Sequence, residues 1–320
     1  MVVTRVNILN NDSIRDQFIQ GVKLLKEESL SSGWPNTYDL FVIWHYTAMN
    51  TFTPSTQSNR NAAHMGPIFL PWHRYMLILL EYHLQRVLND DSFGLPYWDW
   101  ARDGELPVSQ QNNSPIWSNS CMGGTGTPIT TGPFAVGSWK INVREDMNGN
   151  LVRTNSSLRR NFGSTLERRL PTKAEVQTAL NRGRPNVFYD VEPWDDNSVS
   201  FRNELEGWMN TPPTRLHNAV HVWVRGDMIL GTSPNDPVFY LNHCNVDRIW
   251  SGWMKEYNNP EYLPRDNESN DLKGHRLNDL MHSMEEDDLF DPVYSGRVRP
   301  IDVLDPSSRY VYDAIEFDRL

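Results

Sequence analysis

The chain has 320 residues, 40 of them acidic and 30 basic, which gives a formal net charge of −10. This length suits one large domain with a sizeable core, which buries about three quarters of the surface of the extended chain. The negative charge disfavours nucleic acid and anionic membranes as partners, whereas a small neutral molecule is not repelled.

The amino terminus, MVVTRVNILNND, lacks the basic and then apolar pattern of a secretory signal. No apolar run approaches the roughly 20 residues of a membrane span. Two cysteines, Cys121 and Cys244, provide no disulfide framework. We therefore expect a cytoplasmic protein without a membrane segment, and export on a separate partner protein stays open as an alternative.

Apolar residues recur at helical spacing in seven stretches, and the fourth begins with a Thr172-x-x-Glu175 capping box. Between about 104 and 170 the chain is rich in Gly, Thr, Asn, Pro and Ser, with short alternating runs near 133–144 that predict small strands. The pattern predicts one mainly α domain with an irregular insertion. The predicted helices are 12–28, 37–51, 72–89, 172–182, 198–209, 214–224 and 236–256.

Six histidines fall into two groups of three. Two matched imidazole triads are suited to a pair of copper ions, for which imidazole is a good ligand. The segment HNAVH places two of them four residues apart on one helix face, where their nitrogens converge on one ion. The groups are His45, His64 and His73, and His217, His221 and His243.

The third histidine of the second group, His243, begins a helical stripe that continues through Asp247, Trp250 and Met254. The stripe predicts that His243 faces inward with a carboxylate one turn away. We therefore expect Asp247 to accept a hydrogen bond from a ligand histidine and to orient it.

The first group combines histidines from different kinds of segment. His45 lies in an aromatic-rich predicted helix, His64 in a polar loop and His73 near the start of an amphipathic helix. Loop and helix ligands together complete a three-coordinate site with one open position. For His45, beside Trp44 and Tyr46, a hydrogen-bonded core histidine is the alternative, but the pattern of six histidines favours a metal site.

Other histidines are not assigned to the metal site. His83 points about 80° away from the face of His73, because each helical residue advances by about 100°. His275 and His282 flank a charged segment and are expected at the surface. Cys244 turns roughly 100° away from His243 and is expected to be a small buried residue.

In these histidines and the segments around them, the sequence resembles the type 3 copper proteins, and within them the bacterial-type tyrosinases and o-aminophenol oxidases. HMGPIFLPWHRYMLILLE around His64 and His73 is similar to the first-copper signature, and SPNDPVFYLNHCNVDRIW around His243 to the second. HNAVHVWV lies between them in the expected order. Shorter similar stretches are GPFAVGSW at 132–139, LRRNFG at 158–163 and FRNELEGW at 201–208.

The resemblance implies two copper ions, one bound by each histidine triad. It implies a mainly α fold whose central antiparallel helical bundle holds the dicopper site, with long loops and a few short β-strands. Phe239, four residues before His243, would cap the second copper as an aromatic gate. Glu206 and Asn218 match an acid and an amide that hold a water beside the second copper and take the proton of an incoming phenol.

Two positions depart from the family pattern. Asn242 replaces the first of a usual histidine pair, but the register keeps His243 as the ligand. Position 62 is alanine, so the cysteine that forms a thioether to this histidine in fungal, plant and molluscan members is absent.

Near the end of the sequence, Tyr310-Val311-Tyr312 resembles the Tyr-x-Tyr element that closes the catalytic domain. In the family a tyrosine of this element packs against an arginine near the amino terminus, here Arg5. Residues 1–320 are therefore expected to form a single catalytic domain without the carboxy-terminal shielding domain of latent forms.

The implied activity is ortho-hydroxylation of monophenols and oxidation of o-diphenols to o-quinones with O₂. The alternatives are an o-aminophenol or catechol oxidase with little monophenol activity and, more remotely, a haemocyanin-like oxygen carrier. Phenolic small molecules and O₂ are the expected partners, a copper-loading accessory protein is a further candidate, and the oligomeric state stays open. The stretch from Gly231 to Ser233 is the candidate for the loop that gates the second copper.

Overall fold

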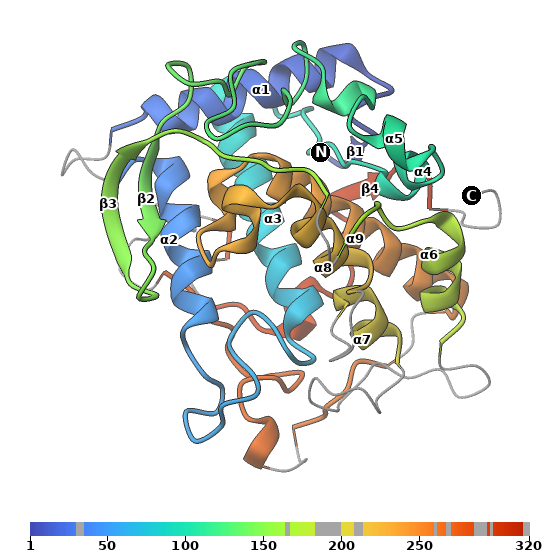
Figure 1. The fold of residues 1–320 in the computed structure, drawn as a ribbon. Coiled ribbons are helices and arrows are strands. Elements are labelled where there is room, and N and C mark those ends of the chain that lie inside the picture. The colour runs from blue at the N-terminus through green and yellow to red at the C-terminus, as the bar shows by residue number, and fades with distance from the viewer. Residues whose placement is uncertain are drawn as a thin grey trace.

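The computed structural model describes residues 1–29, 35–163, 167–182, 200–207, 214–258, 261–266, 270–284, 293–294 and 297–315. Within them the protein is mainly helical, as expected (Figure 1). No helix among these residues has both the length and the apolar character that crossing a bilayer requires. The helices are α1 Asp12–Glu27, α2 Thr37–Met49, α3 Phe69–Leu88, α4 Trp100–Gly104, α5 Val108–Gln111, α6 Lys173–Leu180, α7 Phe201–Glu206, α8 Leu216–Val224 and α9 Val238–Glu256.

Each predicted helix is present, and the capping box of Thr172 and Glu175 opens α6. Helix α3 begins at Phe69, upstream of the predicted start, because Pro71 falls in the first helical turn, where its missing N–H has no intrahelical partner to lose. Short α4 and α5 were not expected. Of the predicted helix 198–209, positions 198–199 and 208–209 lie outside the described residues.

Strands play a small part in this fold. β2 (Ile141–Glu145) and β3 (Leu151–Ser156) form an antiparallel hairpin. The predicted strand region near 133–144 is therefore right only at its end. Residues 133–139 form turns and bends, and Gly137 has a φ of +88°, which extended strands do not allow.

The core is built around α3 and α9. Both helices are buried on nearly all sides, which is the expected place for a helix that is apolar around most of its circumference. Helix α3 contacts α1 and α9, and α8 packs on α9 (Figure 1). The segments that carry the six histidines thus surround the middle of the molecule.

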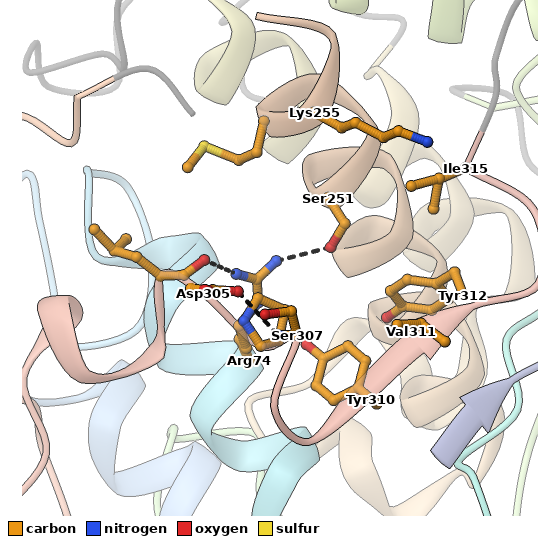
Figure 2. Close-up of a pocket in the computed structure, with 12 residues that line it drawn as sticks. Arg74, Ser251, Lys255, Asp305, Ser307, Tyr310, Val311, Tyr312 and Ile315 are labelled. Atoms are coloured by element: carbon orange, nitrogen blue, oxygen red, sulfur yellow. Dashed lines mark hydrogen bonds between the residues drawn. The ribbon is translucent and has the colours of Figure 1, made fainter. Parts of the chain in front are cut away.

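The first and last strands pair beside α9. β1 (Val3–Arg5) pairs in parallel with β4 (Tyr310–Tyr312). The Arg5 guanidinium lies 3.4 Å from the centroid of the Tyr310 ring, which confirms the predicted arginine–tyrosine contact. Figure 2 shows the nearby Arg74 between Ser251 and the segment that leads into β4; its Nη2 donates to Ser251 Oγ at 2.9 Å.

Candidate metal centre

The structure brings the six predicted histidines together as two triads. In each triad, one possible ligand atom from every histidine lies within 4.8 Å of the others. The first triad draws on α2, the loop before α3, and α3; the second draws on α8 and α9. Members of the two triads are also neighbours, since the rings of His73 and His243 stack with centroids 4.1 Å apart.

Backbone carbonyls fix the orientation of four imidazole rings. The Nδ1 atom of His45 lies 2.7 Å from the Gly231 carbonyl oxygen, and that of His73 lies 2.8 Å from the Phe69 oxygen. In the second triad, Nδ1 of His217 and of His221 lie 3.2 Å and 2.5 Å from the carbonyl oxygens of Glu206 and Met228. When Nδ1–H donates to a carbonyl, the Nε2 lone pair is left for a metal ion.

The Nε2 atoms of five of these histidines are placed as metal ligands would be. Nε2 of His45, His73 and His221 is buried without a hydrogen-bond partner. Nε2 of His217 and His243 lie 3.1 Å apart. Buried nitrogens that converge without donors are costly unless an ion binds them, so the residues present fit a pair of metal ions.

All six rings are held neutral by their surroundings. Burial lowers the pKa of His45 to about 3 and that of His221 to about 4. The pKa values of His64, His73, His217 and His243 also lie well below the usual range, through burial and the proximity of other histidines. Neutral imidazole is the form that binds a metal, so the site is ready for ions at neutral pH.

Asp247 does not orient a histidine, and this expectation is wrong. Its carboxylate accepts hydrogen bonds from Arg74 Nε at 2.6 Å and from the hydroxyls of Tyr310 and Tyr312 at 2.6 and 2.5 Å. Buried arginines attract a carboxylate more strongly than a neutral imidazole does, so Asp247 pairs with Arg5 and Arg74 beside β1 and β4. Backbone carbonyls take the orienting role instead.

Phe239 is fully buried and packs against both triads. Its ring centroid lies 4.1 Å from that of His243 and 4.9 Å from that of His45. It is absent from the residues that line the cavity over the histidines. Phe239 thus forms a wall against which the rings of both triads pack, and its role as a gate stays a prediction.

Glu206 and Asn218 both lie beside His217 of the second triad, Glu206 through its carbonyl oxygen and Asn218 as the next residue in α8. Helix α7 ends at Glu206 because Gly207 adopts a φ of +96°, and a Cβ there would lie 1.9 Å from the Arg215 carbonyl oxygen and 3.2 Å from Asn218 Cβ. The Glu206 carboxylate accepts a hydrogen bond from the Met65 N–H at 2.7 Å and pairs with Arg202. The Asn218 Nδ2 atom is buried without a partner.

An open cavity of about 240 Å³ leads to the histidines. Ser233 lines it but is buried, as are Gly231 and Thr232. Among the described residues of the lining, Ile229 is the exposed one, with 53% of its surface accessible. The mouth of the cavity thus lies at Ile229, two residues before the stretch from Gly231 to Ser233. That stretch is buried, and the Gly231 carbonyl oxygen is bonded to His45. A second hollow of about 180 Å³, drawn in Figure 2, contains no triad histidine.

His275 was expected at the surface and is instead fully buried. Its Nε2 lies 2.8 Å from Thr53 Oγ1 and its Nδ1 accepts from the Ile68 N–H at 3.4 Å. The ring thereby ties together the two ends of the loop that carries His64. Nothing in the local sequence pointed to this contact, because its partners lie more than two hundred positions away. His282 is half-buried.

Comparison with solved structures shows the class of fold. A polyphenol oxidase from Thermothelomyces thermophila aligns with a TM-score of 0.69 at 20% identity, covering 98% of this chain and 89% of that one. A functional unit of octopus haemocyanin aligns with a TM-score of 0.57 at 20% identity, covering 99% and 69%. Two adjacent imidazole triads on this helical scaffold define a type 3 copper protein fold.

Sequence comparison then gives the family. The model for the common central domain of tyrosinase matches residues 35–256. A tyrosinase of Streptomyces glaucescens is 36% identical over 303 residues, 93% of each chain. A grixazone synthase of Streptomyces griseus is 37% identical over 303 residues, 86% of this chain and 90% of the relative. The chain belongs to the tyrosinase family, and is a copper-dependent oxidoreductase of that family.

Proposed function

We propose that one copper ion binds to His45, His64 and His73 and a second to His217, His221 and His243, and that the protein is a tyrosinase. The main support for this proposal is the pair of triads, whose buried and neutral ring nitrogens converge. When bound, the copper pair supplies the redox chemistry by which O₂ hydroxylates a phenol ortho to its hydroxyl group and oxidises the diphenol to a quinone.

The chain positions these ions and excludes water from most of their surroundings. Carbonyl groups from Gly231, Phe69, Glu206 and Met228 hold four of the rings in place. The Phe239 ring packs against His45 of the first triad and His243 of the second. A phenol enters through the cavity, whose lining brings its ring against His45, His64, His217 and His221. Such rigid support keeps the reacting groups aligned.

Glu206 and Asn218 are proposed to remove the phenolic proton. A free phenol has a pKa of about 10, so a base is needed at neutral pH. Each carboxylate oxygen has two lone pairs, so Glu206 can accept a water in addition to Met65 and Arg202. The free Asn218 Nδ2 donor holds that water from the other side. Monophenol hydroxylation depends on this step, whereas diphenol oxidation depends on it less.

The alternative activity is an o-aminophenol or catechol oxidase with little monophenol activity. A grixazone synthase at 37% identity shows that relatives this similar do not all carry the name tyrosinase. An oxygen carrier is disfavoured by the open cavity over the histidines, which admits more than O₂. Copper loading by an accessory protein and a cytoplasmic location stay predictions from the sequence.

The test is copper content per chain, measured with oxygen uptake. We expect two copper ions per polypeptide and uptake with tyrosine or 4-methylphenol as well as with catechol. Uptake with catechol and an o-aminophenol but with neither monophenol would favour the alternative oxidase. One metal ion per chain would contradict the proposed centre.

A further inference from the structure

The cavity over the histidines is lined by residues without charged side chains. Among the described residues that line it, no lysine, arginine, aspartate or glutamate is present. Apart from the four histidines, the polar lining side chains are Asn61, Thr214, Asn218 and Ser233. A charged group on a bound molecule therefore meets no lysine, arginine, aspartate or glutamate among these described lining residues.

Three acidic groups that are bonded to residues in or beside the lining, or that lie next to a lining residue in the chain, are already engaged by protein donors. Glu145 accepts a hydrogen bond from the Gly231 N–H at 2.6 Å. Glu206 pairs with Arg202, and Asp227 accepts from Arg159 Nη2 at 2.9 Å. Protein donors already bind these carboxylates. An ammonium group that entered the cavity would have to compete with those donors for a carboxylate.

The apolar part of the lining is rich in methionine and suited to aromatic molecules. It consists of three methionines, Met49, Met65 and Met228, together with Val222, Ile229 and Leu230. Thioether side chains adapt their shape and make favourable contacts with aromatic rings. Ile229 at the mouth is 53% exposed, so that an entering molecule covers apolar surface there.

We propose that this site selects phenols whose para substituent is uncharged and apolar, and that it discriminates against phenols that carry a carboxylate or an ammonium group, including the amino acid tyrosine. The proposal rests on the proposed function. Burial of an apolar substituent among the methionines is favourable, whereas a charged substituent loses water without gaining a partner. Selection acts on binding, so it applies to monophenols and diphenols alike.

The first test compares kcat/KM for substrates of similar size on the copper-loaded enzyme. We expect 4-ethylphenol to exceed L-tyrosine, tyramine and 3-(4-hydroxyphenyl)propanoate by about tenfold or more. The same order is expected for 4-ethylcatechol against L-DOPA. Equal or reversed values in both series would overturn the proposal while leaving the phenol oxidase activity intact. No turnover with any of these compounds would overturn the proposed function and this inference with it.

The second test places one charge at the mouth. Position 229 is exposed enough for a lysine ammonium group to stay in water. Ile229→Lys is therefore expected to raise kcat/KM for 3-(4-hydroxyphenyl)propanoate relative to 4-ethylphenol by about fivefold or more. Met147→Lys is the matched control, because it adds the same charge at a fully exposed position that does not line the cavity. An unchanged ratio in Ile229→Lys, or an equal shift in both variants, would overturn the assignment of selectivity to the lining.

Discussion

Glu145 and Gly231 connect the β2–β3 hairpin to the metal centre. The Glu145 carboxylate accepts a hydrogen bond from the Gly231 N–H at 2.6 Å, and the Gly231 carbonyl oxygen lies 2.7 Å from Nδ1 of His45. A Cβ at position 231 would lie 2.9 Å from the same carboxylate. Of the two peptide units that meet at Gly231, one is thereby held by Glu145 and the next orients His45.

This relationship predicts that Glu145→Ala weakens copper binding by the first triad. Loss of a partner that orients a ligand lowers metal affinity by about 10- to 100-fold. Glu145→Gln keeps an acceptor oxygen and serves as the control, with a smaller loss. The measurement is copper retained per chain during titration with a chelator, and wild-type retention by Glu145→Ala would contradict the role.

His221→Ala is expected to remove the second copper ion and with it oxygen binding. The ring supplies one of three nitrogens, and its Nδ1 is held by the Met228 carbonyl oxygen at 2.5 Å. Copper content should fall from two ions per chain to about one, and the near-ultraviolet band of the oxygenated protein should disappear. His83→Gln changes a buried histidine outside both triads and should retain both ions. An unchanged band in His221→Ala would refute the ligand assignment.

Glu206→Gln is expected to lower monophenol hydroxylation on the order of 100-fold, with a much smaller effect on diphenol oxidation. The amide keeps the shape of the carboxylate but cannot take up the phenolic proton. Glu204→Gln, in the same helix, is the control, because Glu204 pairs with Arg182 and Arg215. The two activities are compared at measured copper content. Equal losses in both would remove the role of a base from Glu206.

Asp247→Asn is expected to destabilise the fold by about 3–5 kcal/mol, because it leaves two buried arginines without their shared carboxylate. Burial alone would raise the pKa of Asp247, but Arg74 and Arg5 outweigh it and the pKa is lowered. This stabilisation is therefore present above the pKa of the unfolded state and is lost as pH falls through the lower pKa of the folded state. Asp12→Asn at an exposed site is the control in thermal unfolding at pH 7.

Glu167 gives a pH dependence of the opposite sign. Burial raises its pKa from 4.5 to about 7, although Thr214 Oγ1 donates to it at 3.0 Å. The folded protein then binds a proton that the unfolded chain releases, so its contribution to stability is full below pH 4.5 and declines as the pH rises towards 7. Glu167→Gln should flatten this part of the curve of unfolding free energy against pH. A slope identical to the wild type would show that other groups cause it.

The helices and the candidate ligands were largely predictable, because their signals are local. Apolar periodicity located α1 and α9 to within a few residues, and the spacing of His217 and His221 placed both rings on one face of α8. The polar loop of His64 has no periodic signal, and its grouping with His45 and His73 rested on the division of six histidines into two sets of three.

The roles of neighbouring side chains were decided by tertiary contacts. Asp247 shares a helix with His243, yet it bonds to Arg74 and Tyr310 from distant segments. A buried carboxylate pairs with the strongest donors that the fold brings to it, and sequence spacing does not show which these are.

The sequence by itself indicated which histidines are candidate metal ligands and which helices carry them, because both follow from residue type and from spacing along the chain. Only the tertiary structure decided that Glu145 holds Gly231, that His275 is buried under the loop of His64, and that the cavity lining carries no charge among the described residues. Each of these depends on chain segments that are far apart in sequence. Burial and packing are properties of the whole assembled core, which short-range periodicity does not encode.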